Sequence, residues 1–189
     1  ELQDAASQAV VDFLPLEGAT RILDYCAGGG GKSLAIAARA DARIVAYDID
    51  EKRMRDLPAR AKRAGCDVTV VTDEELEAEA PFDVVFCDAP CSGSGAWRRA
   101  PEGKWRLTED GLKELENTQL SVLQSAAGHV AEGGVLAYAT CSLLACENED
   151  RVAAFCAENA EWSCRSEKRW KVSDGGDGFY VAILERVSD

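Results

Sequence analysis

The sequence lacks most features that mark secreted, membrane and zinc proteins. It has a single histidine, His129, and no C-x-x-C pair among its eight cysteines, so the usual zinc spacings are missing and we predict no metal site. No apolar run approaches the roughly 20 residues that a membrane span requires. The N-terminus has no basic region, no apolar region and no initiating methionine, so we expect no signal peptide. We therefore expect a cytoplasmic chain, cut from a longer protein.

Positive charge is also scarce. The chain has 21 Lys and Arg against 34 Asp and Glu, a formal net charge of -13. Such a chain repels a polyanion at long range, so any RNA contact must be local. The candidate patch consists of Arg98, Arg99, Lys104 and Arg106, interleaved with Trp97 and Trp105. A second basic group at 168–171, around Trp170, is interpreted as a solvated face.

The cysteines are expected to be reduced. An even number can indicate a disulfide framework, but here the cysteines lie inside helix and strand patterns and nothing suggests export. We interpret some of them as buried core residues, namely Cys66, Cys87, Cys156 and Cys164. Trp162 and Trp170 are interpreted as core anchors.

Strand and helix patterns alternate along the chain. The predicted strands are 21–25, 43–47, 68–71, 83–87 and 135–139, and the predicted helices are 5–14, 32–40, 51–64, 108–131 and 147–159. The acidic segment 73–79 is expected as a short helix or a loop. His129 is expected on the long helix as a surface or cap residue. Residues 179–184 alternate like a terminal strand, with 162–165 as its hairpin partner. This order predicts an α/β fold with a doubly wound, mostly parallel sheet and an antiparallel C-terminal strand.

A glycine-rich loop, 26–32, joins the first predicted strand to the following helix. Its glycines permit positive φ and let a nucleotide or nucleoside approach the backbone. Dinucleotide, flavin and methyl-donor folds share such loops, so a nicotinamide-dependent oxidoreductase is an alternative. That alternative needs a second half to bind nicotinamide and does not explain the loop cysteines described below. An ATPase phosphate loop fails, because its first glycine would stand where the chain has Cys26.

Three aspartates follow the second and third predicted strands. Asp48 ends the second strand, where such folds place a carboxylate against ribose hydroxyls. Asp50 is interpreted as a helix cap. For Asp73, contact with an adenine amino group and an ordinary helix cap remain equally open.

Two further loops each carry a cysteine. They are Asp88-Ala89-Pro90-Cys91-Ser92-Gly93 and Ala139-Thr140-Cys141-Ser142, and both follow predicted strands. Loops at these strand ends face the crevice where ligands bind, so both cysteines can converge on one substrate. A thiolate beside a methyl donor suits methylation of cytosine, since its addition to C6 makes C5 nucleophilic. Asp88 is placed to protonate or hydrogen-bond N3 of the ring.

With these motifs the chain resembles the Sun-type family of RNA (cytosine-5) methyltransferases, most closely the bacterial ribosomal RNA small-subunit methyltransferase B branch. The resemblance runs nearly end to end and includes 3–8, 97–99, 104–106, 147–149 and 177–179. It implies a seven-stranded, Rossmann-like, S-adenosylmethionine-dependent methyltransferase fold. It further implies transfer of a methyl group to carbon 5 of a cytosine in RNA, first of all 16S ribosomal RNA, through a covalent Cys–C6 adduct. Methylation of transfer RNA and a non-catalytic module are the alternatives.

The resemblance also implies residue roles. Cys141 is the expected nucleophile, and Cys91 assists release of the product by handling the C5 proton. DNA (cytosine-5) enzymes use the Cys91 position as nucleophile, and the sequence leaves that exchange open. Lys32 is expected to meet the target nucleotide. The implied donor pocket consists of Cys26, Ala27, Gly28, Gly29, Gly30, Gly31, Lys32, Asp48, Asp73 and Asp88.

Two departures from the family affect these expectations. The family usually has Cys-Ala-Ala-Pro-Gly-Gly-Lys, where this chain has Gly28 and Gly29 in place of alanine and proline. Loss of the proline makes the loop costlier to order, so we expect weaker donor binding. Members of this branch carry an N-terminal RNA-binding domain, whereas residues 1–189 correspond to one catalytic domain. We expect that domain to be absent here and activity on naked RNA to be weak.

Overall fold

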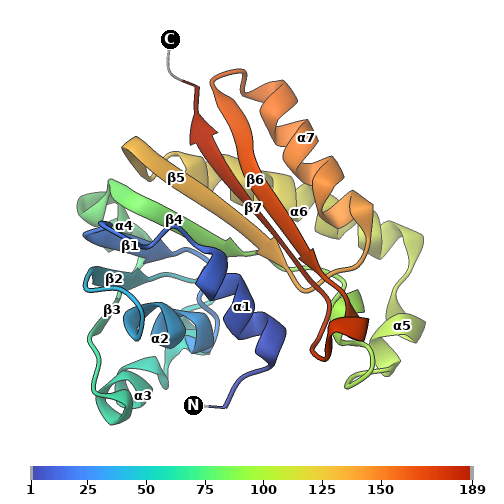
Figure 1. Cartoon of the computed structure of the whole chain (residues 1–189), viewed down its shortest axis with the longest axis horizontal. Coiled ribbons are helices and arrows are strands. Elements are labelled where there is room, and N and C mark those ends of the chain that lie inside the picture. Colours follow the sequence, from blue (N-terminus) through green and yellow to red (C-terminus); the bar gives the residue numbers. More distant parts are fainter. Residues whose placement is uncertain (1, 188–189) are drawn as a thin grey trace.

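The computed structural model describes residues 2–187, which form a seven-stranded sheet with helices on both faces (Figure 1). The strand order is β3-β2-β1-β4-β5-β7-β6. β7 pairs antiparallel with both of its neighbours, and the other pairs are parallel. The predicted doubly wound α/β sheet with an antiparallel C-terminal strand is confirmed.

The elements follow one another in an alternating order. The strands are β1 Arg21–Asp24, β2 Arg43–Ala46, β3 Val68–Val70, β4 Phe82–Asp88, β5 Val130–Thr140, β6 Trp162–Trp170 and β7 Phe179–Arg186. The α-helices are α1 Ala5–Phe13, α2 Gly31–Ala37, α3 Leu57–Ala64, α4 Asp73–Glu79, α5 Glu102–Arg106, α6 Glu109–Ala127 and α7 Glu149–Glu158. Short 3-10 helices occupy Glu51–Met54, Ser94–Ala96, Ala145–Glu147 and Val172–Asp174.

Neighbouring residues of each central strand face opposite layers, because side chains alternate along a strand. Ile22 of β1 packs with α1 and α2, whereas the adjacent Leu23 packs with the layer that contains Leu123 of α6 and Phe155 of α7. All four side chains are fully buried. Burial on both faces explains why the central strands are almost entirely apolar.

Two helix predictions were wrong in extent. The predicted helix 51–64 is divided into a 3-10 helix and α3, because Pro58 has no N–H and is accommodated in the first turn of α3. The predicted helix 108–131 ends at Ala127, and β5 begins at Val130. His129 therefore lies after the helix. It is buried against the ring of Tyr25, with the ring centroids 5.7 Å apart, and is not a surface residue.

The predicted core residues were partly wrong. Cys87 and Trp162 are buried as expected. Cys66 and Cys156 are only half-buried, and Cys164 is exposed because β6 is the edge strand. Trp170 is also half-buried and packs edge-on against Phe13 of α1. All eight cysteines are free.

No helix within residues 2–187 has the length and apolar composition needed to cross a membrane. The same part of the chain holds no group of three or more His, Cys, Asp or Glu side chains arranged to bind a metal ion.

The sheet has a topological switch point between β1 and β4. The chain leaves β1 towards β2 on one side, and later strands extend from β4 on the other. In open α/β sheets, ligands bind outside the carboxyl ends of the strands at such a point. Asp24, Asp88 and Thr140 are the last residues of β1, β4 and β5, so this edge carries the polar residues of the site.

Candidate active site

Two cavities open at the switch point. One, of about 400 Å³, lies over the ends of β1, β2 and β4 against α6, and its lining includes Tyr25, Tyr47, Asp48, Ile49 and Val122. The other, of about 370 Å³, lies between the glycine loop and the C-terminal part of the chain, and its lining includes Gly28, Lys32, Arg99, Asp177 and Phe179. Among the described residues, both cavities are lined by Cys26, Arg53, Asp88 and Cys141. The two spaces therefore meet beside Cys141.

The two loop cysteines converge as predicted. Their Sγ atoms lie 3.5 Å apart. β4 and β5 are parallel neighbours in which Asp88 pairs with Ala139, so both loops leave the same edge of the sheet. The loops also bind each other, because the backbone N–H of Gly95 donates to the carbonyl of Cys141 at 2.9 Å.

The surroundings of the two thiols differ. The hydrogen bond with Cys91 lowers the pKa of Cys141, and the nearby ammonium of Lys32 contributes, although burial and Asp88 oppose this shift. The same hydrogen bond, together with burial and the charge of Glu147, raises the pKa of Cys91. Cys141 is therefore the thiol with the greater thiolate character. Cys26 is not a competitor, because burial and Asp24 raise its pKa.

Lys32 and Asp88 form an ion pair on the floor of the site. Lys32 Nζ lies 2.5 Å from Asp88 Oδ2 and 5.1 Å from the centroid of the Phe179 ring. Burial acts to lower the pKa of Lys32, but the Asp88 carboxylate outweighs it and raises that pKa. The ammonium thus stays charged next to both a carboxylate and the Cys141 thiol.

Asp48 lies at the end of β2, where the sequence predicted it. Its side chain is 2% exposed. It accepts hydrogen bonds from the Gly28 backbone N–H at 2.8 Å and from Arg53 Nη1 at 3.0 Å. Asp50 caps the following 3-10 helix by accepting from the backbone N–H of Lys52, so its predicted role is confirmed.

The glycine loop uses the conformational freedom of its glycines. Gly28 has φ of +53° and Gly30 has φ of +80°, in the region that side chains with a Cβ rarely adopt. Gly30 is the N-cap of α2, and a Cβ there would overlap the buried side chain of Leu57. An alanine at 28 would face both a strained backbone and the Arg53 guanidinium, so this loop is built around glycine at that position.

Asp24, the last residue of β1, binds the first turn of α2 across the glycine loop. It is fully buried and accepts a hydrogen bond from Ser33 Oγ at 2.6 Å, while its other oxygen has no partner among the described residues. Burial raises the pKa of Asp24 to about 7.

Asp73 does not cap α4, so that alternative is wrong. Thr72 is the N-cap and forms a capping box with Glu75. Asp73 instead accepts a hydrogen bond from the Tyr47 hydroxyl at 2.9 Å, and it does not line either cavity. Its contact with an adenine amino group remains a prediction.

The predicted basic patch is divided in the structure. Arg98 and Arg99 both pair with the buried carboxylate of Asp177, and Arg98 also pairs with Asp4. On α5, Lys104 lies over the ring of Trp105, which is 81% exposed. The side chains at 104–106 are all exposed.

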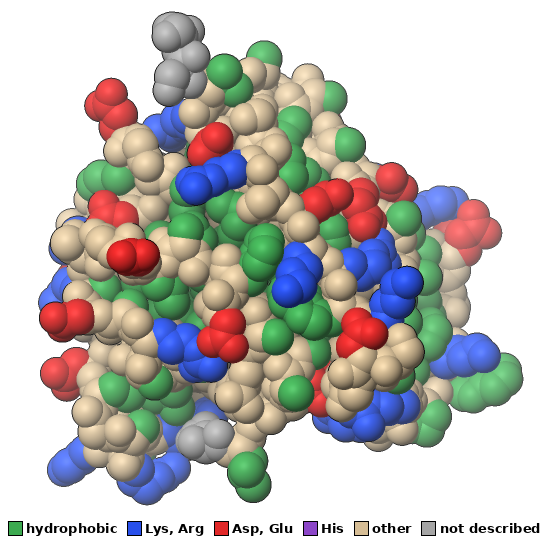
Figure 2. All heavy atoms as spheres, viewed as in Figure 1, with side chains coloured by type: hydrophobic (Ala, Val, Ile, Leu, Met, Phe, Trp, Pro, Cys, Tyr) green, Lys and Arg blue, Asp and Glu red, His purple; other side chains and the backbone are tan. Residues whose placement is uncertain are grey.

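The second basic group is engaged with the protein rather than solvated throughout. Lys168 lies over the Trp170 ring, and Arg169 pairs with Glu149 at 2.5 Å. On the face shown in Figure 2, Lys and Arg side chains are interspersed with Asp and Glu and form no continuous basic surface.

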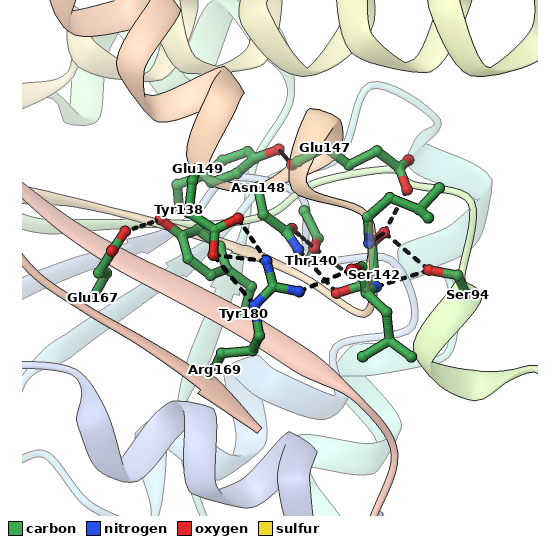
Figure 3. Close-up of polar contacts among 12 residues, drawn as sticks. Ser94, Tyr138, Thr140, Ser142, Glu147, Asn148, Glu149, Glu167, Arg169 and Tyr180 are labelled. Atoms are coloured by element: carbon green, nitrogen blue, oxygen red, sulfur yellow. Dashed lines mark hydrogen bonds and ion pairs between the residues drawn. The ribbon is translucent and has the colours of Figure 1, made fainter. Parts of the chain in front are cut away.

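The sequence interpretation missed several site residues. Arg53 lines both cavities but was hidden within a predicted helix. Asp177 and Glu147 belonged to motifs of the resemblance without an assigned partner. Glu147 is fully buried between the two cysteine loops, and Figure 3 shows it beside Ser142 and Asn148. Its place in the motif 147–149 of the resemblance, five residues after Ser142, is the sequence signal that could have found it.

Comparison with known proteins gives consistent results. The family model described as 16S rRNA methyltransferase RsmB/F matches residues 11–185. The chain is 35% identical to ribosomal RNA small subunit methyltransferase B of Klebsiella pneumoniae, over 97% of the chain and 46% of that relative. It is 36% identical to the protein of the same name from Serratia proteamaculans, over 98% of the chain and 47% of that relative. The chain therefore spans about half the length of these curated relatives.

A solved structure has the same fold. The crystal structure of NSun6 from Pyrococcus horikoshii with SFG superposes with a TM-score of 0.84 at 26% identity, over 99% of this chain and 53% of that one.

Proposed function

Because this chain belongs to the 16S rRNA methyltransferase RsmB/F family, we propose that it transfers a methyl group to carbon 5 of a cytosine in ribosomal RNA, in the cytoplasm. The observation that carries the cytosine-5 chemistry is the pair of thiols 3.5 Å apart beside Lys32 and Asp88, where two cavities meet. Methylation of a ring nitrogen or of an exocyclic amine needs no thiol, because the nitrogen itself attacks the methyl group. Two thiols are explained by a reaction that both forms and breaks a bond to carbon.

The cofactor is S-adenosylmethionine, and the residues of the larger cavity fit it. Asp48 offers a buried carboxylate for ribose hydroxyls, and the exposed side chain of Ile49 offers an apolar surface for adenine. The glycine loop borders this cavity at Cys26, and a Cβ at Gly28 or Gly30 would meet the side chain of Arg53 or Leu57. When bound, the cofactor supplies an electrophilic methyl group on a sulfonium.

In this proposal Cys141 is the nucleophile. Its thiolate adds to C6 of the cytosine, which moves electron density to C5 and forms one carbon–sulfur bond. The hydrogen bond from Cys91 and the charge of Lys32 stabilise that thiolate before attack. Cys91 is less suited to attack, since the charge of Glu147 and burial both favour its protonated form.

Asp88 and Lys32 act on the ring. Addition at C6 is easier when N3 carries a proton, and Asp88 lines both cavities together with Cys141. The oxygen of Asp88 that Lys32 does not hold can accept a hydrogen bond from an N3 that has taken its proton from solvent. Lys32 holds one oxygen of this carboxylate and so fixes its orientation. Phe179 lies beyond the ammonium and gives the base an apolar wall.

Cys91 serves the second half of the reaction. After methylation, the C5 proton must leave so that the C6–S bond can break and return the electron pair to Cys141. Cys91 first releases its own proton to solvent, and its thiolate then lies close enough to Cys141 to accept the C5 proton, directly or through one water. Without it, the adduct persists.

RNA contact is proposed for α5. Arg98 and Arg99 are already paired with Asp177, whereas Lys104 and Arg106 are exposed and form no ion pair among the described residues, and the exposed Trp105 lies between them. A base stacked on Trp105 contributes roughly 1–3 kcal/mol. Trp105→Ala is expected to weaken RNA binding, measured by filter binding at low salt, without changing S-adenosylmethionine binding.

The proposed reaction is tested by product analysis. The chain, in excess over substrate at low salt, is incubated with S-adenosylmethionine labelled in its methyl group and with 16S ribosomal RNA, and the RNA is digested to nucleosides. Label is expected in 5-methylcytidine. Label only in another nucleoside contradicts the cytosine-5 proposal, and label in transfer RNA but not ribosomal RNA contradicts the proposed substrate.

A further inference from the structure

Glu147 binds the two cysteine loops to each other. Its Oε1 accepts from the Ser92 backbone N–H at 2.7 Å and from Gln119 Nε2 at 3.0 Å. Its Oε2 accepts from the hydroxyls of Ser92 and Ser142, both at 2.5 Å. Ser92 directly follows Cys91, and Ser142 directly follows Cys141. One carboxylate therefore fixes the residue next to each thiol.

The position is an unusual one for a carboxylate. Glu147 is fully buried, and no lysine or arginine within residues 2–187 forms an ion pair with it. Burial of an unpaired charge is expensive unless hydrogen bonds replace its hydration. The donors from Ser92, Ser142 and Gln119 provide that replacement, and they come from three separate segments. If this position only had to stabilise the core, apolar side chains would do so as well as a buried carboxylate.

Neighbouring hydrogen bonds also hold the two cysteine loops together. Ser94 Oγ lies 3.0 Å from Ser142 Oγ and accepts from the Leu143 backbone N–H at 2.7 Å. Asn148, the next residue after Glu147, donates to the carbonyl of Ser142 at 3.0 Å (Figure 3). These bonds hold the Cys141 loop against the Cys91 loop, with Glu147 at the point where the two loops touch.

We infer that Glu147 is a positioning residue for the methyl transfer proposed above, which sets the distance between the Cys91 and Cys141 thiols. It touches neither cavity, so it acts on the reaction only through the loops. The inference rests on the proposed function for its purpose, but the thiol spacing is measurable without RNA or methyl transfer.

The test is the rate at which Cys91 and Cys141 form a disulfide with diamide, which oxidises two thiols and is reduced to the hydrazine. Mass spectrometry of non-reduced tryptic peptides identifies the pair among the eight cysteines. In Glu147→Ala the rate is expected to fall about tenfold or more, because misplacement by about 1 Å has effects of that order or larger in catalytic sites. Asp150→Ala, an exposed carboxylate in the next turn, is the matched control and should keep the original rate.

Glu147→Gln distinguishes positioning from charge. A glutamine oxygen can accept from the Ser92 N–H and Gln119, while its NH₂ group donates to the serine hydroxyls, which accept as well as donate. Its cross-linking rate should therefore stay within about threefold of the original. Circular dichroism and S-adenosylmethionine binding establish that each variant is folded.

The outcomes distinguish the positioning role of Glu147 from the proposed methyl transfer. A folded Glu147→Ala that cross-links at the original rate overturns the inference. If Glu147→Ala does not fold, Ser142→Ala removes one hydroxyl and is expected to slow cross-linking, and an unchanged rate there overturns the inference instead. Slow cross-linking in Glu147→Ala with no 5-methylcytidine from the original chain supports the positioning role while the proposed function fails.

Discussion

Gly30→Ala is the substitution whose cost follows most directly from the structure. Gly30 has φ of +80°, so an alanine there adopts a left-handed backbone at a cost of roughly 1–2 kcal/mol. Its Cβ would lie 2.7 Å from Cδ2 of Leu57 and closer still to Cδ1. Leu57 is fully buried, so relieving this overlap costs about 1–3 kcal/mol more. The free energy of unfolding should fall by about 2–5 kcal/mol.

Gly18→Ala is the matched control. Gly18 has φ of +77°, but a Cβ there meets no atom within 4 Å. It therefore carries the backbone cost without the overlap. Urea denaturation of both variants should give a difference of about 1–3 kcal/mol between them. Equal losses in the two variants would refute the argument that Leu57 closes the space behind the glycine loop.

Donor binding should separate the two variants further. Gly30 caps the helix that begins at the donor loop, whereas Gly18 lies before β1. Isothermal titration with S-adenosylmethionine should show weaker binding in Gly30→Ala and unchanged binding in Gly18→Ala.

Two other changes have defined outcomes. Burial raises the pKa of Asp24 from 3.8 to about 7, so between these values the folded state holds a proton that the unfolded state has lost. Stability should therefore decline as pH rises through that range, and urea denaturation of Asp24→Asn should show a flatter profile; an identical decline would contradict this. Asp177→Asn removes the charge that holds Arg98 and Arg99, and should lower the free energy of unfolding by about 1 kcal/mol at low salt. That loss should shrink in 1 M salt, and a loss independent of salt would show that packing dominates.

Much of the fold was predictable because its signals are local. Apolar strands that alternate with amphipathic helices indicate a mostly parallel sheet, as the structure has it. The errors occurred where local and tertiary preferences compete. Pro58 lies in the first turn of α3, within a segment of helical periodicity, and Gly133 and Gly134 lie inside β5 instead of ending a helix. Cys164 was assigned to the core because nothing in the sequence marks β6 as the edge strand.

The site was predictable where residues stand at strand ends. Asp88 ends a strand of the sheet, and Asp48, Cys91 and Cys141 follow strands of the same sheet, so their convergence follows from topology. Pairings between segments distant in the chain were not accessible. The bond from Glu147 to Ser92 spans 55 residues, and no periodicity or spacing predicts it.

The most direct test of the covalent proposal is adduct formation in cysteine variants. The original chain, Cys91→Ala and Cys141→Ala are each incubated with S-adenosylmethionine and a cytidine-containing ribosomal RNA, and denaturing gels detect RNA bound covalently to protein. Cys91→Ala should accumulate the adduct, since the C6–S bond cannot be resolved, and Cys141→Ala should form none. An adduct in Cys141→Ala, or its methylation of RNA at the original rate, would contradict the account.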